Sequence, residues 1–220
     1  MKILTEMAYP IEIRDQNDVV LDGILTIPQQ VHGVVIFAHG SGSHHLSPRN
    51  QSIAIVLNKV GIATLLFDLL TADEKAQDAI NSALRFDIAL LSDRLEIATK
   101  WVLNHPALRS LPVGYFGSST GAAAAMVAAA RMAHVIRAVV SRGGRPDLAD
   151  ESLKHVRAAT LFIVGSLDHV VVELNEKAQR QLMCENKIEL IAGATHLFEE
   201  PGTIEKVAML AQYWFQQHLR

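Results

Sequence analysis

The sequence contains one cysteine, Cys184, so no disulfide can form within the chain. Disulfides persist in oxidising compartments, and their absence favours a reducing one. Residues 1–15 also lack an apolar segment of the length that a signal peptide needs. We therefore expect a cytoplasmic protein.

Long hydrophobic runs and clusters of like charge are missing as well. The longest unbroken stretch of small apolar residues extends from Ala122 to Ala130, far short of the roughly 20 residues that a membrane-spanning helix needs. The 20 Lys and Arg residues nearly balance the 23 Asp and Glu residues, the formal net charge is −3, and no basic stripe forms. Neither nucleic acid nor a membrane is an expected partner, and monomer and homo-oligomer both stay open.

Half of the 220 residues are hydrophobic, and this length suits one compact domain over residues 1–220. Short apolar runs alternate with helix-like segments, which is typical of an α/β fold with a mostly parallel sheet and helices on both faces. Residues 10–14 and 19–28 flank a turn-prone Asp-Gln-Asn-Asp segment and are expected to form an antiparallel hairpin. Further strands are expected at 34–38, 62–67, 113–116, 136–141, 160–164 and 187–191, helices at about 48–59, 86–104, 120–133, 171–183 and 203–218, and a loop or short helix at 71–83.

Residues 117–121 read Gly-Ser-Ser-Thr-Gly, a G-x-S-x-G pattern between an expected strand and an expected helix. A sharp strand-to-helix turn holds the central serine, Ser119, clear of the sheet, and the crowded backbone there requires small residues two positions before and after it. The pattern predicts a nucleophilic serine. Taken without its context, the same segment would also suit a simple Gly/Ser-rich turn.

The strand at 34–38 is followed by His39-Gly40-Ser41-Gly42. Its glycines allow backbone N–H groups to face a pocket, so the N–H groups of Ser41 and Thr120 are candidates for an oxyanion hole. A phosphate-binding loop is the alternative, but the P-loop ending and the third glycine of a dinucleotide loop are missing. His39 is expected to be structural, and the adjacent His44 and His45 lack the spacing of a metal site. We expect no cofactor and no metal.

An acid and a histidine follow the next two strands in chain order. Asp168 ends a Gly-Ser-Leu-Asp segment, and His196 lies in Ala-Thr-His. The order Ser, Asp, His and the position of each residue at the carboxyl end of a strand predict a catalytic triad. The alternatives are a helix-capping role for His196 and another acid near a strand end in place of Asp168, namely Asp68, Asp147 or Glu173.

Together these four segments resemble the dienelactone hydrolase-like branch of the α/β-hydrolase superfamily. The resemblance covers nearly the whole chain and implies about eight strands, with the first hairpin at one edge of the sheet. It also implies hydrolysis of an ester, lactone or related acyl bond through an acyl-enzyme. Dienelactone hydrolases proper use a cysteine as nucleophile, whereas this chain has Ser119, which favours general carboxylester chemistry.

The segment from 141 to 160 bears on specificity. Arg142 and Arg145 follow a strand on the same side as the triad, and either one is a candidate for binding a substrate carboxylate. Both are also placed to pair with nearby acids, Asp147 among them. The segment has room for one short helix and no large cap, so we expect an open site for small soluble substrates. An acyltransferase or thioesterase with the same triad, or a catalytically silent binding protein, are the alternative functions.

Overall fold

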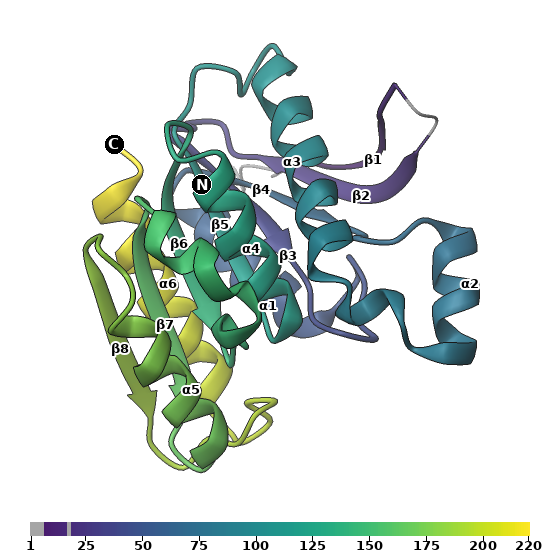
Figure 1. The fold of residues 1–220 in the computed structure, drawn as a ribbon. Helices are drawn as coiled ribbons and strands as arrows, with labels where there is room; N and C mark the ends of the chain where they lie inside the picture. The colour runs from purple at the N-terminus through teal and green to yellow at the C-terminus, as the bar shows by residue number, and fades with distance from the viewer. Residues whose placement is uncertain (1–6, 17–18) are drawn as a thin grey trace.

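The computed structural model describes residues 7–16 and 19–220 and contains one eight-stranded sheet (Figure 1). The strands are β1 (Met7–Arg14), β2 (Val20–Ile27), β3 (Gly33–Ala38), β4 (Ile62–Phe67), β5 (Val113–Ser118), β6 (Ile136–Arg142), β7 (Ala159–Gly165) and β8 (Asn186–Ile191). Their order across the sheet is β1-β2-β4-β3-β5-β6-β7-β8. The pairs β1–β2 and β2–β4 are antiparallel and all others are parallel, which confirms the predicted α/β fold.

The first two strands form the predicted antiparallel hairpin at one edge of the sheet. Arg14 faces Val20 in the register, and Asp15 closes the turn by accepting a hydrogen bond from the Val19 N–H at 2.9 Å. Asn17 and Asp18, the last two residues of the predicted turn, lie outside the described residues. In β2, the alternate residues Leu21, Gly23 and Leu25 are buried, as expected of a strand with one face on the core.

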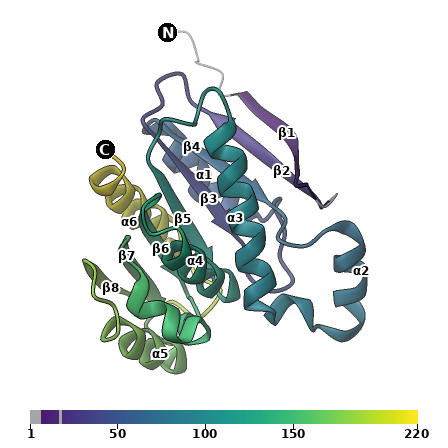
Figure 2. The ribbon, with the colours of Figure 1, turned by 45° about the horizontal axis from the view of Figure 1, so that its top comes forward.

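Helices cover both faces of the sheet (Figures 1 and 2). They are α1 (Pro48–Lys59), α2 (Ala72–Asn81), α3 (Ile88–Asn104), α4 (Thr120–Arg131), α5 (His169–Gln179) and α6 (Thr203–His218), with 3₁₀ segments η1 (Leu84–Phe86) and η2 (Pro146–His155). One core lies under α3 and α4, and a second lies under α1 and α6. No helix in the described ranges is long and apolar enough to cross a membrane.

Of the loop and the short helix expected as alternatives at residues 71–83, the structure contains the helix, whereas α5 ends earlier than expected. Residues 72–81 form a ten-residue helix, α2, because Thr71 and Glu74 cap each other's backbone N–H groups at its start. Helix α5 ends at Gln179 instead of about residue 183, and tighter turns then bring Leu182 into the core. Between β6 and β7 the chain forms only η2, so the expected absence of a large cap is confirmed.

Candidate active site

Ser119 sits on the sharp turn between β5 and α4, with φ 50° and ψ −121°. A non-glycine residue is rarely found in this conformation, and surrounding contacts must hold it there. The Ser119 N–H donates to the Arg142 carbonyl at 3.2 Å, and the Ser119 carbonyl accepts from the Arg145 N–H at 3.1 Å. The start of α4 therefore lies directly after the hydroxyl-bearing residue, where the helix dipole favours negative charge.

The glycines of the turn are required by close backbone contacts. A Cβ atom on Gly121 would lie 2.3 Å from the Ala38 carbonyl oxygen, and one on Gly117 would lie 2.5 Å from the Ala122 Cα atom. Both distances are far below van der Waals contact. Gly40 is also close to the turn, since its Cβ would lie 3.0 Å from that of Ser119. The steric reason for the G-x-S-x-G spacing thus holds in the structure.

Asp168 and His196 come together from the loops after β7 and β8. The His196 Nδ1 atom lies 2.6 Å from Asp168 Oδ2. When Nδ1 carries the proton and donates it to the carboxylate, Nε2 keeps its lone pair free. Ser119 and His196 line one pocket of about 220 Å³, which we call the triad pocket. Of the acids considered from the sequence, Asp168 is the one that contacts His196 within the described residues.

The two candidate oxyanion-hole residues are neighbours. The Ser41 hydroxyl lies 2.9 Å from that of Thr120. Ser41 belongs to a tight turn, in which the Ser43 N–H donates a hydrogen bond to the Gly40 carbonyl at 3.1 Å. Such a turn needs a residue with positive φ, and Gly42 provides it with a φ of 70°. Within the described part of the chain, no hydrogen bond engages the backbone N–H of Ser41 or Thr120.

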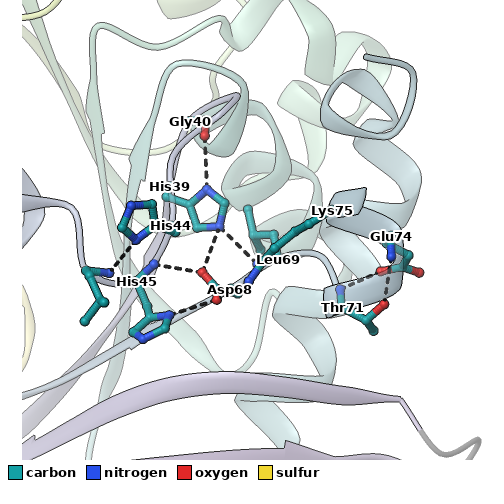
Figure 3. Close-up of polar contacts among 10 residues, drawn as sticks. His39, Gly40, His44, His45, Asp68, Leu69, Thr71, Glu74 and Lys75 are labelled. Atoms are coloured by element: carbon teal, nitrogen blue, oxygen red, sulfur yellow. Dashed lines mark hydrogen bonds and ion pairs between the residues drawn. The ribbon is translucent and has the colours of Figure 1, made fainter. Parts of the chain in front are cut away.

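A polar cluster that the sequence did not predict holds this turn in place (Figure 3). His39 Nε2 accepts from the Leu69 N–H at 3.1 Å, and its Nδ1 lies 3.0 Å from the Gly40 carbonyl. Asp68 accepts from the backbone N–H and the ring Nδ1 of His45, each at 2.8 Å, and pairs with Lys75. The cluster therefore ties the turn after β3 to the segment after β4, in agreement with the expected structural role of His39.

Burial shapes the titration of this cluster. It lowers the pKa of His39 below its ordinary value, and the hydrogen bond with the Gly40 carbonyl and the charge of Asp68 only partly oppose the effect. Burial would raise the pKa of Asp68, but hydrogen bonds from Lys75 and His45 outweigh it and lower that pKa. His39 is thus neutral and Asp68 ionised at neutral pH. Among the described residues, no group of three or more His, Cys, Asp and Glu side chains is arranged to hold a metal ion.

The two arginines of the 141–147 segment have different surroundings. Arg145 is bound by both carboxylate oxygens of Asp147, at 2.9 and 2.7 Å, which is the ion pair that the sequence left open. Arg142 lines the triad pocket and is 9% exposed, and its Nε and Nη1 atoms lack a hydrogen-bond partner among the described residues. Its guanidinium carbon lies 5.8 Å from the centre of the Phe198 ring.

Arg142 therefore contributes to the triad pocket a positive charge that has no partner among the described residues. Burial, together with the charge of Arg49, lowers the pKa of Arg142 to about 10, so the side chain stays protonated at neutral pH. Arg49 lines the same pocket and pairs with Glu199 at 3.2 Å. A buried cation without a partner is costly unless a ligand supplies one.

The sequence profile of the dienelactone hydrolase family matches residues 21–219. The chain belongs to the dienelactone hydrolase family. A dienelactone hydrolase from Anabaena variabilis is 50% identical and superposes with a TM-score of 0.95, with 98% of this chain and 99% of that chain covered. Est1E from Butyrivibrio proteoclasticus shares the fold at 16% identity, with a TM-score of 0.79 and coverage of 94% and 98%. Membership of this family supports a hydrolase activity.

Two proteins from Mycobacterium tuberculosis strains are 56% identical to this chain over 197 residues and carry a phosphoribosyl transferase name. The aligned region covers 90% of this chain and 44% of theirs. The chain therefore spans less than half the length of these curated relatives. The hydrolase-family match covers nearly all of the chain.

Proposed function

We propose that this family member is a serine hydrolase that cleaves an ester, lactone or related acyl bond through an acyl-enzyme formed on Ser119. The observation that carries the proposal is the Asp168–His196 pair at 2.6 Å, with His196 and Ser119 lining one pocket. A serine hydroxyl is a weak nucleophile unless a positioned base removes its proton. An Asp-oriented histidine is the base that this arrangement supplies.

In the proposed reaction, His196 Nε2 takes the proton of the Ser119 hydroxyl as Oγ forms a bond to the substrate carbonyl carbon. The backbone N–H groups of Ser41 and Thr120 stabilise the oxyanion, a contribution of about 3–4 kcal/mol to the barrier for each donor. The intermediate collapses by breaking the bond to the alcohol oxygen, which receives the proton from His196. Water then attacks the acyl-enzyme by the same route, releasing the acid and restoring Ser119.

The surroundings of the site support small, soluble substrates with an anionic group. The connection between β6 and β7 holds only η2, and His196 is 40% exposed at its side chain, so water and small esters have access. The unpaired Arg142 in the triad pocket provides a partner for a carboxylate or phosphate on the substrate.

We assign no phosphoribosyl transfer to this chain. The region that it shares with the mycobacterial proteins is the region matched by the hydrolase family, and it leaves more than half of their length unaligned. The proposed roles of Ser119, Asp168 and His196 are those of nucleophilic acyl chemistry.

Hydrolysis of p-nitrophenyl acetate by the wild-type protein and by Ser119→Ala tests the proposal. We expect turnover by the wild-type protein and loss of at least about a thousandfold in kcat for the variant, with only uncatalysed and oxyanion-hole hydrolysis left. Thermal unfolding of both proteins controls for misfolding. Equal turnover by the two folded proteins, or none by the wild type on any small ester, would overturn it.

A further inference from the structure

A second cavity of about 410 Å³ adjoins the triad pocket. The turn after β3, the segment after β4, and parts of α2 and α3 enclose it, and we call it the side pocket. Gly40, Ser41 and Ser43 line both pockets, so the two meet at the candidate oxyanion hole, and Thr120 also lines the side pocket. Its volume falls in the range of about 300–1,000 Å³ that is usual for small-molecule sites.

The strong charges that line the side pocket are already paired. Lys75 pairs with Asp68 (both are labelled in Figure 3), and Arg85 Nε donates to Asp78 at 2.6 Å. The Arg85 backbone N–H also donates to Asp78 at 3.0 Å. Burial opposes ionisation of Asp78, but the Arg85 contacts outweigh it and lower the pKa of Asp78. A charged ligand group would have to break one of these pairs.

Apolar atoms make up most of the exposed lining of the side pocket, which also includes polar side chains such as Ser43, His44 and Thr120. Leu69, Leu70 and Leu91 contribute side chains that are otherwise buried, and Ala79 of α2 also lines the cavity. Burial of apolar groups against such a lining is favourable, whereas an unpaired polar group would lose its hydration there. The side pocket thus favours an uncharged apolar group, in contrast to the triad pocket with its unpaired Arg142.

The position of His196 indicates which pocket faces the alcohol part of an ester (its alcohol arm) and which faces the acyl part (its acyl arm). The leaving alcohol oxygen takes its proton from His196, so the alcohol arm departs on the histidine side. His196 lines the triad pocket and is not among the residues that line the side pocket. The acyl arm therefore points past the Ser41 turn, toward the side pocket.

We propose that the side pocket binds the acyl arm of the substrate and selects an uncharged, apolar acyl group, while the alcohol arm lies in the triad pocket beside Arg142. This inference rests on the proposed hydrolase function and adds the substrate class: an ester of an apolar acid with an anionic alcohol. Ala79, which is exposed on α2, becomes a specificity-determining residue.

A series of p-nitrophenyl esters from acetate to hexanoate tests the inference. For the wild-type protein we expect kcat/KM to rise about three- to fourfold per added methylene group until the pocket is full. Ala79→Trp places an indole in the cavity, and we expect it to lower the hexanoate-to-acetate ratio of kcat/KM at least tenfold. Ala76→Trp, on the same helix but outside the lining, serves as the matched control and should leave the ratio unchanged.

Binding of hexanamide, an uncharged mimic of the acyl product, is measured by calorimetry on the same proteins, with circular dichroism to confirm folding. If esters are cleaved but Ala79→Trp leaves the acyl-length ratio unchanged, or alters dependence on the alcohol instead, the inference is overturned. If no ester is cleaved, the proposed function fails, and the binding of hexanamide then tests the side pocket by itself. Binding to the wild-type protein and to Ala76→Trp, but not to Ala79→Trp, supports an apolar site there. No binding to the wild-type protein, or equal binding to Ala79→Trp, refutes such a site.

Discussion

The His196 Nδ1 atom lies 2.6 Å from Asp168 Oδ2, although the two residues belong to different loops after β8 and β7. The contact fixes the orientation of the imidazole and directs its other nitrogen away from the carboxylate. His196 and Ser119 line one pocket, so in the proposed mechanism this pair activates the serine.

Replacing Asp168 with Asn is expected to lower kcat by about three to four orders of magnitude while preserving the fold. The amide favours the wrong imidazole tautomer and no longer stabilises the imidazolium. The measurement is steady-state hydrolysis of p-nitrophenyl acetate. Glu151→Gln is the matched control, because Glu151 is exposed and pairs only with Lys154 among the described residues. Equal losses in both variants would contradict the role of Asp168.

Replacing Arg142 with Gln is expected to reduce kcat/KM for an ester with an anionic alcohol, such as 4-acetoxybenzoate, by about 10- to 100-fold relative to phenyl acetate. A charge-assisted hydrogen bond is of this magnitude. Arg145→Gln should leave the ratio of kcat/KM for the two substrates unchanged, because the Arg145 guanidinium is already bound to Asp147. An unchanged ratio in Arg142→Gln would count against an anion contact at this residue.

Replacing Gly121 with Ala is expected to lower the free energy of unfolding by about 3 kcal/mol or more, since the new methyl group meets backbone at 2.3 Å. Gly202 provides the comparison. It has a φ of 79°, and no atom lies within 4 Å of the position that an added methyl group would take, so Gly202→Ala should cost only about 1–2 kcal/mol of backbone strain. Denaturant unfolding measures both, and equal losses would refute the steric argument.

Replacing His39 with Gln is expected to flatten the dependence of stability on pH. Burial lowers the pKa of His39, so the unfolded chain protonates first, and stability falls as the pH drops from about 6.5 toward the folded-state pKa. The contribution is at most about 1.4 kcal/mol per pH unit. The charges of Asp68, Lys75 and His44 also shift the pKa of His39. The pKa of Asp68 is lowered and lies below this pH range, so Asp68 stays ionised across it. Parallel slopes for both proteins between about pH 7 and pH 5 would contradict the prediction.

The sequence was sufficient to predict the sheet, most helices and the loops that carry Ser119, Asp168 and His196, because periodicity and motif spacing are local signals. Contacts between distant segments were not predictable. The hydrogen bond from Leu69 to His39 joins residues 30 positions apart, and no sequence pattern indicates it. Helix α2 was ambiguous because its start depends on a side-chain cap.

The difference between Arg142 and Arg145 was also beyond the sequence. Both arginines stand within a few residues of Asp147, so either could pair with it. The chain bends at Gly143, whose φ is 50°. Arg142 stays buried at the end of β6, while Arg145 reaches Asp147. The bend at Gly143 and the burial of Arg142 thus determine which arginine pairs with Asp147, and the residue types alone indicate neither.

Covalent labelling by a fluorophosphonate, followed by mass spectrometry of the intact protein and its peptides, tests whether Ser119 is the nucleophile. We expect one added phosphonyl group on the wild-type protein, located on Ser119, with its rate of formation greatly reduced in Asp168→Asn. Labelling at another residue, or labelling of Ser119→Ala at the wild-type rate, would contradict it.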